Sequence, residues 1–166
     1  MNAVAPTPSI RFVAAVPANT AGVRELLRVA DPDDVAIDGY IGRGVCHGLY
    51  CEAQLVGIAV LLPQGPDVVE LANMAIHPDF QGRGLGKELL RHLIAEARKA
   101  GFARLVVSTG NSSLGPLALY QKAGFRITGV TPDHFTRHYP EPIEENGIPC
   151  LDQIHLNLKL SDHTGV

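Results

Sequence analysis

The sequence predicts a mixed α/β fold, with a central mixed sheet of about seven strands flanked by about four helices. Hydrophobic residues make up 46% of the 166 residues but aromatic residues only 5%, so the core is expected to be aliphatic. Strand-like runs at 45–52 and 54–62 are joined by so short a link that they predict an antiparallel hairpin. From 68 to 130 strand and helix patterns alternate, which predicts parallel strands joined by right-handed crossovers.

The N-terminal part is expected to form one strand and two helices. The run IRFVAAV, which starts at Ile10, is typical of a short strand. Asn19 or Thr20 is predicted to cap an amphipathic helix, and a second, weaker helix is expected from 33 to 41. The apolar face of the first helix is expected to include Val23, Leu26, Leu27 and Ala30.

A long amphipathic helix from about 84 to 100 is the strongest element. A predicted strand at 68–76 and a glycine-rich loop precede this helix, and Gly101 is predicted to end it. Its apolar face is expected to be formed by Leu85, Leu89, Leu90, Leu93, Ile94 and Ala97.

The C-terminal part is expected to complete the sheet. Strands at 104–108 and 125–130 enclose a helix at 114–123, and the alternation of apolar and polar residues predicts a final strand at 151–160. The stretch 131–149 is polar, contains prolines and is long for a passive connection, so a functional loop is expected there.

Length and charge restrict the domain organisation and the partners. A chain of 166 residues fits a single domain, which is expected over 9–160, with short tails at 1–8 and 161–166. The net charge of -3 and the interspersed signs leave no basic stripe, so a nucleic-acid partner is not expected. No apolar run approaches the roughly 20 residues that cross a bilayer, so no membrane partner is expected either.

The cysteines indicate a reducing compartment. Cys46, Cys51 and Cys150 form neither a CxxC pair nor an even framework, so we expect reduced packing residues in a cytoplasmic protein without structural zinc. The state of assembly is left open between a monomer and a homodimer.

The loop from Gln81 to Lys87 carries the clearest chemistry. Glycines at 82, 84 and 86 lie between a strand and a helix start, where free backbone N–H groups and the helix dipole attract anions. Arg83 and Lys87 add positive charge, and a diphosphate has the size that such a loop can bind. The Walker pattern fails at Gln81 and Glu88, and the Rossmann pattern fails at Lys87.

The string MAIHPDFQGRGLGKELL resembles the acetyl-CoA motif of the GNAT family of N-acetyltransferases, whose core is [Q/R]xxGx[G/A]. Gln81, Gly84 and Gly86 fall on that core, and the later string ALYQKAGF resembles a second motif of the family. The segment HFTRHYPEPIEENGIPCLD resembles a poorly characterised bacterial subgroup. The resemblance implies an N-acetyltransferase that moves the acetyl group of acetyl-CoA to a primary amine of a small molecule or peptide, by direct attack in a ternary complex.

The resemblance also implies where acetyl-CoA binds. The two strands that correspond to 68–76 and 104–108 would splay apart, and the pantetheine arm would lie in the gap and pair with backbone groups of Met74 and Ile76. Many relatives carry an Asn where this chain has Ser113, with Asn111 two positions earlier, so the hydrogen bond to the coenzyme there is open. The cofactor-binding set is Met74, Ala75, Ile76, Gln81, Gly82, Arg83, Gly84, Leu85, Gly86, Lys87, Asn111, Ser113 and Tyr120.

Three residues are candidates for catalysis. Tyr120 matches the family position that donates a proton to the departing sulfur, and the alternative is a core tyrosine with a satisfied hydroxyl. Glu70 has the spacing of the family's general base, and the alternative is an exposed carboxylate. Asn73 is a candidate for holding the substrate or an ordered water instead.

The stretch 131–149 bears on the choice of acceptor. His134, His138 and Glu141 lie in the acidic loop, whose charge would favour a cationic amine such as a polyamine, an aminoglycoside or a lysine-like group. The alternative is a solvated acidic loop. The spacing of His134 and His138 lacks a third metal ligand, so no metal is expected. The alternative function is a non-catalytic module that binds or senses acyl-CoA.

Overall fold

The computed structural model describes residues 8–161, so most of both predicted tails lies outside the described residues. Seven strands form one mixed sheet in the order β1-β2-β3-β4-β5-β9-β6, which confirms the predicted fold class. The described chain divides into two compact units, residues 8–62 with 73–92 and residues 63–72 with 93–161. A single domain over 9–160 stays a prediction.

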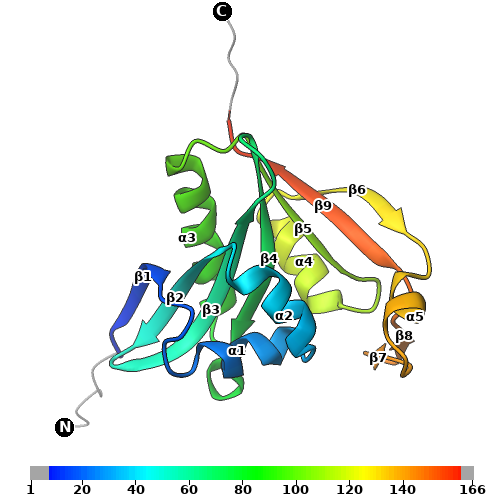
Figure 1. The fold of residues 1–166 in the computed structure, drawn as a ribbon, viewed down its shortest axis with the longest axis horizontal. Coiled ribbons are helices and arrows are strands. Elements are labelled where there is room, and N and C mark those ends of the chain that lie inside the picture. Colours follow the sequence, from blue (N-terminus) through cyan, green and yellow to red (C-terminus); the bar gives the residue numbers. More distant parts are fainter. Residues whose placement is uncertain (1–7, 162–166) are drawn as a thin grey trace, which may run out of the picture. The chain divides into compact units, whose positions relative to one another are not determined.

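The first unit contains the N-terminal strands and helices (Figure 1). Strand β1 (Ile10–Val16) pairs antiparallel with β2 (Val45–Cys51), and β2 pairs antiparallel with β3 (Gln54–Pro63). The predicted hairpin is confirmed, because Cys51 lies opposite Gln54 across a two-residue turn.

Helices α1 (Val23–Ala30) and α2 (Asp34–Ile41) follow β1. Val23, Leu26 and Leu27 are buried as predicted, whereas Ala30 is exposed. The predicted cap at Asn19 or Thr20 is wrong. The N-cap is Gly22, whose φ of 88° is open to glycine, and no side chain caps the helix.

Strand β4 (Val68–Ile76) and helix α3 (Leu85–Lys99) occupy the predicted positions. The short helix η1 (Pro78–Phe80) lies between them and was not predicted. Gly101 ends α3 as predicted, with a φ of 88°, and its N–H donates to the carbonyl of Arg98. The predicted apolar face of α3 is buried except for Leu85, which is half-buried; the buried members are Leu89, Leu90, Leu93, Ile94 and Ala97.

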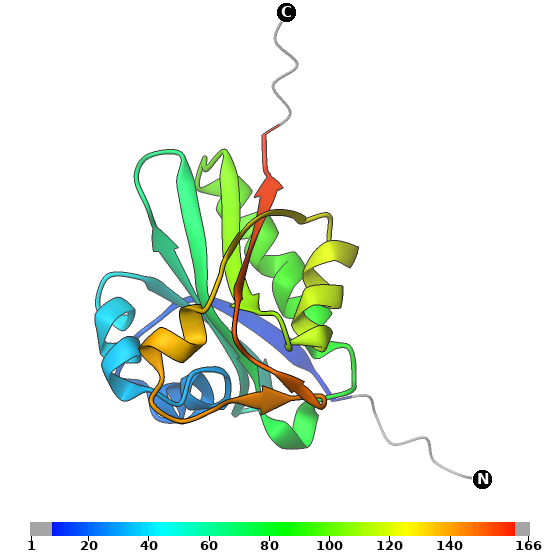
Figure 2. The same cartoon turned by 90° about the vertical axis from the view of Figure 1, so that its right-hand side faces the viewer.

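The second unit contains β5 (Arg104–Gly110), α4 (Leu114–Lys122), β6 (Arg126–Thr131) and β9 (Gln153–Lys159). The first part of β4 pairs parallel with β5, as predicted. Strand β9 comes last in sequence but lies between β5 and β6, antiparallel to both (Figure 2). Its side chains alternate, and Leu156 and Leu158 point into the core.

The stretch predicted as one long loop contains regular structure. It forms α5 (His134–His138) and a small hairpin of β7 (Glu144–Glu145) and β8 (Ile148–Pro149). Asn146 and Gly147 both have positive φ, 55° and 72°, which is the geometry of a tight hairpin turn. In Figures 1 and 2, α5 and the hairpin lie next to each other at one end of β9.

Candidate functional site

The glycine loop forms the start of α3. Gly82 and Gly84 have φ values of 74° and 78°, where a side chain would be strained. The first bond of the helix runs from the N–H of Glu88 to the carbonyl of Gly84, at 3.2 Å. Within residues 8–161, no acceptor takes the N–H groups of the first turn, Leu85 to Lys87. Unpaired N–H groups and the helix dipole favour a bound anion there, so the loop fits the diphosphate of a coenzyme.

Side chains brace this loop against the segment before it. Gln81 donates from Nε2 to the carbonyl of Ile76 at 3.0 Å. Arg83 donates to the carbonyl of Asp79 at 3.0 Å, and its guanidinium lies over the ring of Phe80 at 5.1 Å. The loop is therefore held in shape by its own neighbours, which reduces the entropy lost when it binds a ligand.

Tyr120 lies on α4 with 7% of its surface exposed. Its ring packs against the ring of Phe125, with centroids 5.6 Å apart. No hydrogen bond engages its hydroxyl in the described part of the chain, although buried tyrosine hydroxyls usually have a partner. Burial raises the pKa of Tyr120 to about 12. The hydroxyl is therefore protonated at neutral pH and has a proton to donate.

Asn73 anchors β4 to the two N-terminal helices. Only 5% of its surface is exposed, and Nδ2 donates to the carbonyl of Leu27 at 3.0 Å and to the hydroxyl of Tyr40 at 2.9 Å. The Tyr40 hydroxyl in turn donates to Asp31 at 3.4 Å, and burial raises the pKa of Tyr40 to about 12. The Oδ1 atom of Asn73 is buried and has no partner among the described residues, so contact of Asn73 with a substrate stays a prediction.

The other predicted site residues on β4 are half-buried or buried. Glu70 is half-buried beside Val106 of β5 and accepts a hydrogen bond from Nε2 of Gln64 at 2.7 Å. Its carboxylate is therefore neither fully exposed nor unpaired. Met74 and Ile76 are half-buried and Ala75 is buried, and their predicted backbone contacts with pantetheine stay predictions.

Asn111 and Ser113 tie the segment between β6 and β9 to the start of α4. Oδ1 of Asn111 accepts the N–H groups of Leu151 and Asp152 at 2.8 and 3.0 Å, and its Nδ2 donates to the carbonyl of Pro149. The hydroxyls of Ser112 and Ser113 both donate to Oε1 of Glu145, at 3.1 Å. These side chains have a structural use, and their predicted contact with acetyl-CoA stays a prediction.

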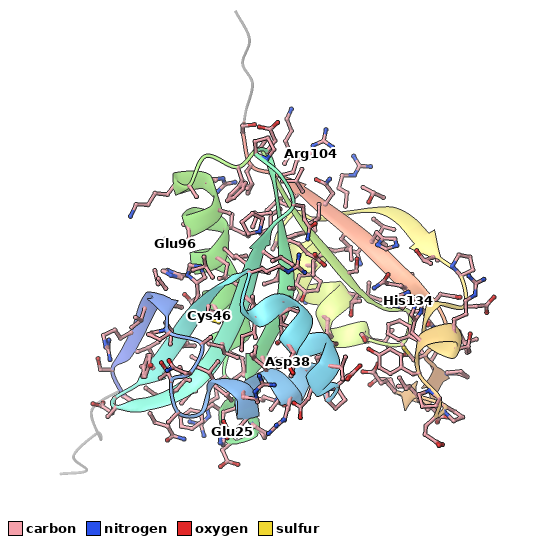
Figure 3. The ribbon with its side chains drawn as sticks, viewed as in Figure 1. Glu25, Asp38, Cys46, Glu96, Arg104 and His134 are labelled. Carbon is pink, nitrogen blue, oxygen red and sulfur yellow. The ribbon has the colours of Figure 1, made fainter. Side chains whose placement is uncertain are left out.

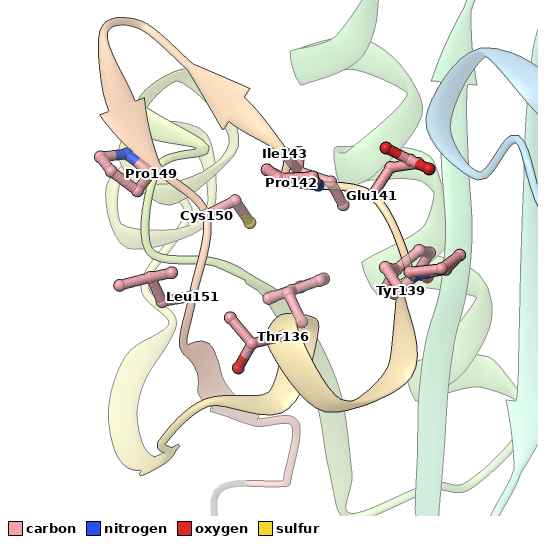
Figure 4. Close-up of a pocket in the computed structure, with 10 residues that line it drawn as sticks. Thr136, Tyr139, Glu141, Pro142, Ile143, Pro149, Cys150 and Leu151 are labelled. Atoms are coloured by element: carbon pink, nitrogen blue, oxygen red, sulfur yellow. The ribbon is translucent and has the colours of Figure 1, made fainter.

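The acceptor candidates do not form one cluster. His134 and His138 lie on α5, with stacked rings 4.4 Å apart, and Figure 3 marks His134 there. Burial and the neighbouring His138 and His155 lower the pKa of His134. Glu141 instead lines a small cavity beside α5 (Figure 4).

One polar cluster was missed by the sequence analysis. His155 of β9 lies between the hydroxyls of Ser108 and Thr131, with Nδ1 at 2.8 Å from one and Nε2 at 2.6 Å from the other. Pairing of β9 with β5 and β6 creates this cluster, so only knowledge of the strand order could have predicted it.

Other expectations concern metals, thiols and membranes. Over residues 8–161, no three His, Cys, Asp or Glu side chains gather as a set of metal ligands. All three cysteines are free and buried, as expected for packing residues, and burial raises the pKa of Cys46. No helix in the described chain has the length and apolar character needed to cross a bilayer.

Comparisons with known proteins agree with the geometry. Residues 22–125 match the model of the Acetyltransferase (GNAT) family. The uncharacterized N-acetyltransferase YvbK of Bacillus subtilis strain 168 is 43% identical over 136 residues, which cover 82% of this chain and 88% of that protein.

Two solved structures show the same similarity. An IAA acetyltransferase from Bacillus cereus ATCC 14579 has 41% identity and a TM-score of 0.86, with 92% of this chain and 100% of that chain covered. A GNAT family acetyltransferase from Elizabethkingia anophelis with acetyl-CoA bound has 40% identity and a TM-score of 0.86, with 91% and 98% covered.

Proposed function

Because the chain belongs to the acetyltransferase (GNAT) family, we propose that it transfers an acetyl group to a primary amine of a small molecule or peptide by direct attack in a ternary complex. It is an acyltransferase, and acetyl-CoA is its co-substrate. The reaction forms a C–N bond to the amine and breaks the C–S bond of the thioester, and the amine proton must leave while the sulfur gains a proton.

The observation that carries this proposal is that the Tyr120 hydroxyl has no hydrogen-bond partner within residues 8–161. A thiol has a pKa near 8.5, so the departing sulfur gains from a nearby acid. A phenol with a pKa of about 12 keeps its proton until the sulfur takes it. The absence of a protein partner in the described chain disfavours the alternative of a core tyrosine with a satisfied hydroxyl.

The glycine loop supports binding of acetyl-CoA. We assign the N–H groups at the start of α3, with Arg83 and Lys87, to the diphosphate. The backbone of Met74, Ala75 and Ile76 is assigned to the pantetheine arm. Holding the amine and the thioester together supplies most of the rate gain, about 7 kcal/mol or more.

The proton of the attacking ammonium needs an acceptor. We assign this role to Glu70, directly or through ordered water. Within residues 8–161 its half-buried carboxylate accepts a hydrogen bond from Gln64 alone, so it keeps lone pairs for a proton. The two N–H groups of the Asn73 amide anchor Leu27 and Tyr40, and its Oδ1, which has no partner within residues 8–161, stays the predicted contact for the substrate or an ordered water.

The acceptor is expected to be cationic. Residues 131–152 contain five carboxylates and one arginine, and such a field attracts an ammonium group. Buried free thiols and the use of acetyl-CoA support a cytoplasmic location. A homodimer remains a prediction.

Release of free thiol from acetyl-CoA in the presence of a panel of primary amines tests the proposal. The panel contains polyamines, aminoglycosides, lysine-like compounds and a peptide with a free N-terminus. Thiol release that depends on an amine, with formation of the N-acetyl product, is the expected result. Tight binding of acetyl-CoA without turnover of any amine would favour a non-catalytic module that binds or senses acyl-CoA.

A further inference from the structure

A cavity of about 170 Å³ lies within the segment between β6 and β9 (Figure 4). Its lining is largely apolar and includes the rings of Phe135 and Tyr139, Ile143, Leu151 and three prolines. Cys150, which is 4% exposed, turns its sulfur toward the hollow. The proposed acetyltransfer assigns no role to these apolar side chains or to Cys150.

Hydrogen bonds hold the walls of this cavity in place. The N–H of Cys150 donates to the carbonyl of Ile143 at 2.8 Å, and the N–H of Phe135 donates to the carbonyl of Leu151 at 3.0 Å. Asn111 binds the backbone at Leu151 and at Pro149, on the same wall. A cavity held in this way loses little entropy when it binds a ligand.

Other hydrogen bonds fasten the same segment to the start of α4, the helix that carries the proposed general acid. Glu145 of the β7–β8 hairpin accepts hydrogen bonds from Ser112 and Ser113, directly before α4. Asn146 donates to the carbonyl of Ser112 at 2.9 Å. Helix α4 carries Tyr120, so a ligand in the cavity would be held by the segment that is fastened to this helix.

The size and charge of the cavity define a ligand. An apolar protein cavity of about 150 Å³ binds benzene, so a volume of about 170 Å³ fits one six-membered ring or a branched aliphatic group. Glu141 is the only carboxylate in the lining, it is exposed, and no hydrogen bond or ion pair engages it within residues 8–161. Apolar walls with one unpaired carboxylate fit an apolar group that carries an amine.

We propose that this cavity binds the side group of the acceptor, so the acceptor class is a primary amine attached to a single aromatic ring or a compact branched aliphatic group. The ammonium is attracted by Glu141 before it loses its proton. This inference rests on the proposed acetyltransfer and narrows its acceptor.

Two amines and one alcohol test the inference on the full chain. 2-Phenylethylamine carries a ring and an amine, ethylamine lacks the ring, and 2-phenylethanol lacks the amine. We expect the kcat/KM of the wild type to be at least about tenfold higher for 2-phenylethylamine than for ethylamine. 2-Phenylethanol should inhibit acetylation of 2-phenylethylamine competitively.

Thr136→Phe fills the cavity from α5, and Thr128→Phe introduces the same ring on β6, outside the lining. The ratio of kcat/KM for 2-phenylethylamine to kcat/KM for ethylamine should fall at least about tenfold in Thr136→Phe. In Thr128→Phe this ratio should stay within about twofold of the wild-type value. An equal preference in the wild type and Thr136→Phe would overturn the inference.

A binding measurement without acetyl-CoA separates this inference from the proposed function. NMR titration of the wild type with 2-phenylethylamine should shift the resonances of Phe135, Tyr139 and Ile143, and it needs no folded variant. Such shifts without thiol release would support binding of the amine in the cavity and contradict the proposed acetyltransferase activity. Acetylation of amines without shifts at these residues would support the proposed activity and overturn the inference that the acceptor binds in the cavity.

Discussion

The ring of Tyr120 packs against the ring of Phe125 with centroids 5.6 Å apart, and the N–H of Phe125 donates to the Tyr120 carbonyl at 3.0 Å. The phenol is therefore fixed at its ring and backbone while its hydroxyl has no partner within the described chain. Fixing a side chain whose polar atom is unused is typical of a group that acts on a substrate.

Removing this hydroxyl should slow turnover. Tyr120→Phe is expected to lower kcat by about 10²-fold or more, because the departing sulfur loses its acid, and to change the Kd of acetyl-CoA little. Thiol release and calorimetry measure the two quantities, and Tyr50→Phe on β2 is the matched control. Unchanged turnover of Tyr120→Phe across pH 7 to 9 would remove Tyr120 from the mechanism.

The pH profile should reflect the amine rather than the tyrosine. The kcat/KM for a simple alkyl amine is expected to rise with pH toward the pKa of the amine, near 10, because only the neutral amine attacks. Deprotonation of Tyr120 should not lower the activity in this pH range, since the pKa of Tyr120 is about 12. A fall in activity between about pH 8 and 9 that Tyr120→Phe abolishes would contradict this assignment.

Asn73 should matter chiefly for stability. Asn73→Ala leaves the Leu27 carbonyl and the Tyr40 hydroxyl without a donor and is expected to lower the free energy of unfolding by about 1–3 kcal/mol. Urea unfolding measures this change, and Tyr40→Phe should cost about 1 kcal/mol. If kcat falls 100-fold or more while stability is unchanged, Asn73 contacts the substrate instead.

Acidification should destabilise the protein partly through His134. Its pKa is lowered from 6.5 in the folded state, so the unfolded state binds more protons as the pH falls. Its contribution to stability is therefore present above about pH 6.5 and is lost as the pH falls below that value. The Tm of the wild type should drop more between pH 7.5 and 5.5 than that of His134→Gln, and equal drops would contradict this.

Local patterns predicted most of the fold. The hairpin, α3 and the stop at Gly101 follow from short-range signals such as periodicity and a glycine with positive φ. The place of β9 between β5 and β6 depends on pairing between distant segments, which periodicity does not encode. The hairpin at Asn146-Gly147 has strands of two residues each, too short to show alternation.

In the candidate site too, local motifs could be predicted from the sequence, whereas contacts between distant residues could not. The glycine loop is contiguous, so its composition and spacing indicated an anion site. The hydrogen bonds of Asn73 reach residues 46 and 33 positions away, and those of Asn111 reach 38 to 41 positions away. Sequence spacing alone cannot predict such partners, so these structural hydrogen bonds could not be predicted, and the expected contacts of both residues with ligands stay predictions.

Calorimetry with coenzyme A and pantetheine tests the central claim most directly, namely that backbone N–H groups at the start of α3 bind the coenzyme's diphosphate. Pantetheine lacks the diphosphate and the phosphoadenosine attached to it, so it should bind at least about tenfold more weakly than coenzyme A. Gly84→Ala, which strains a residue with a φ of 78°, should weaken coenzyme A binding by a similar factor. Equal heats for both ligands, or no heat with well-folded protein, would contradict the claim.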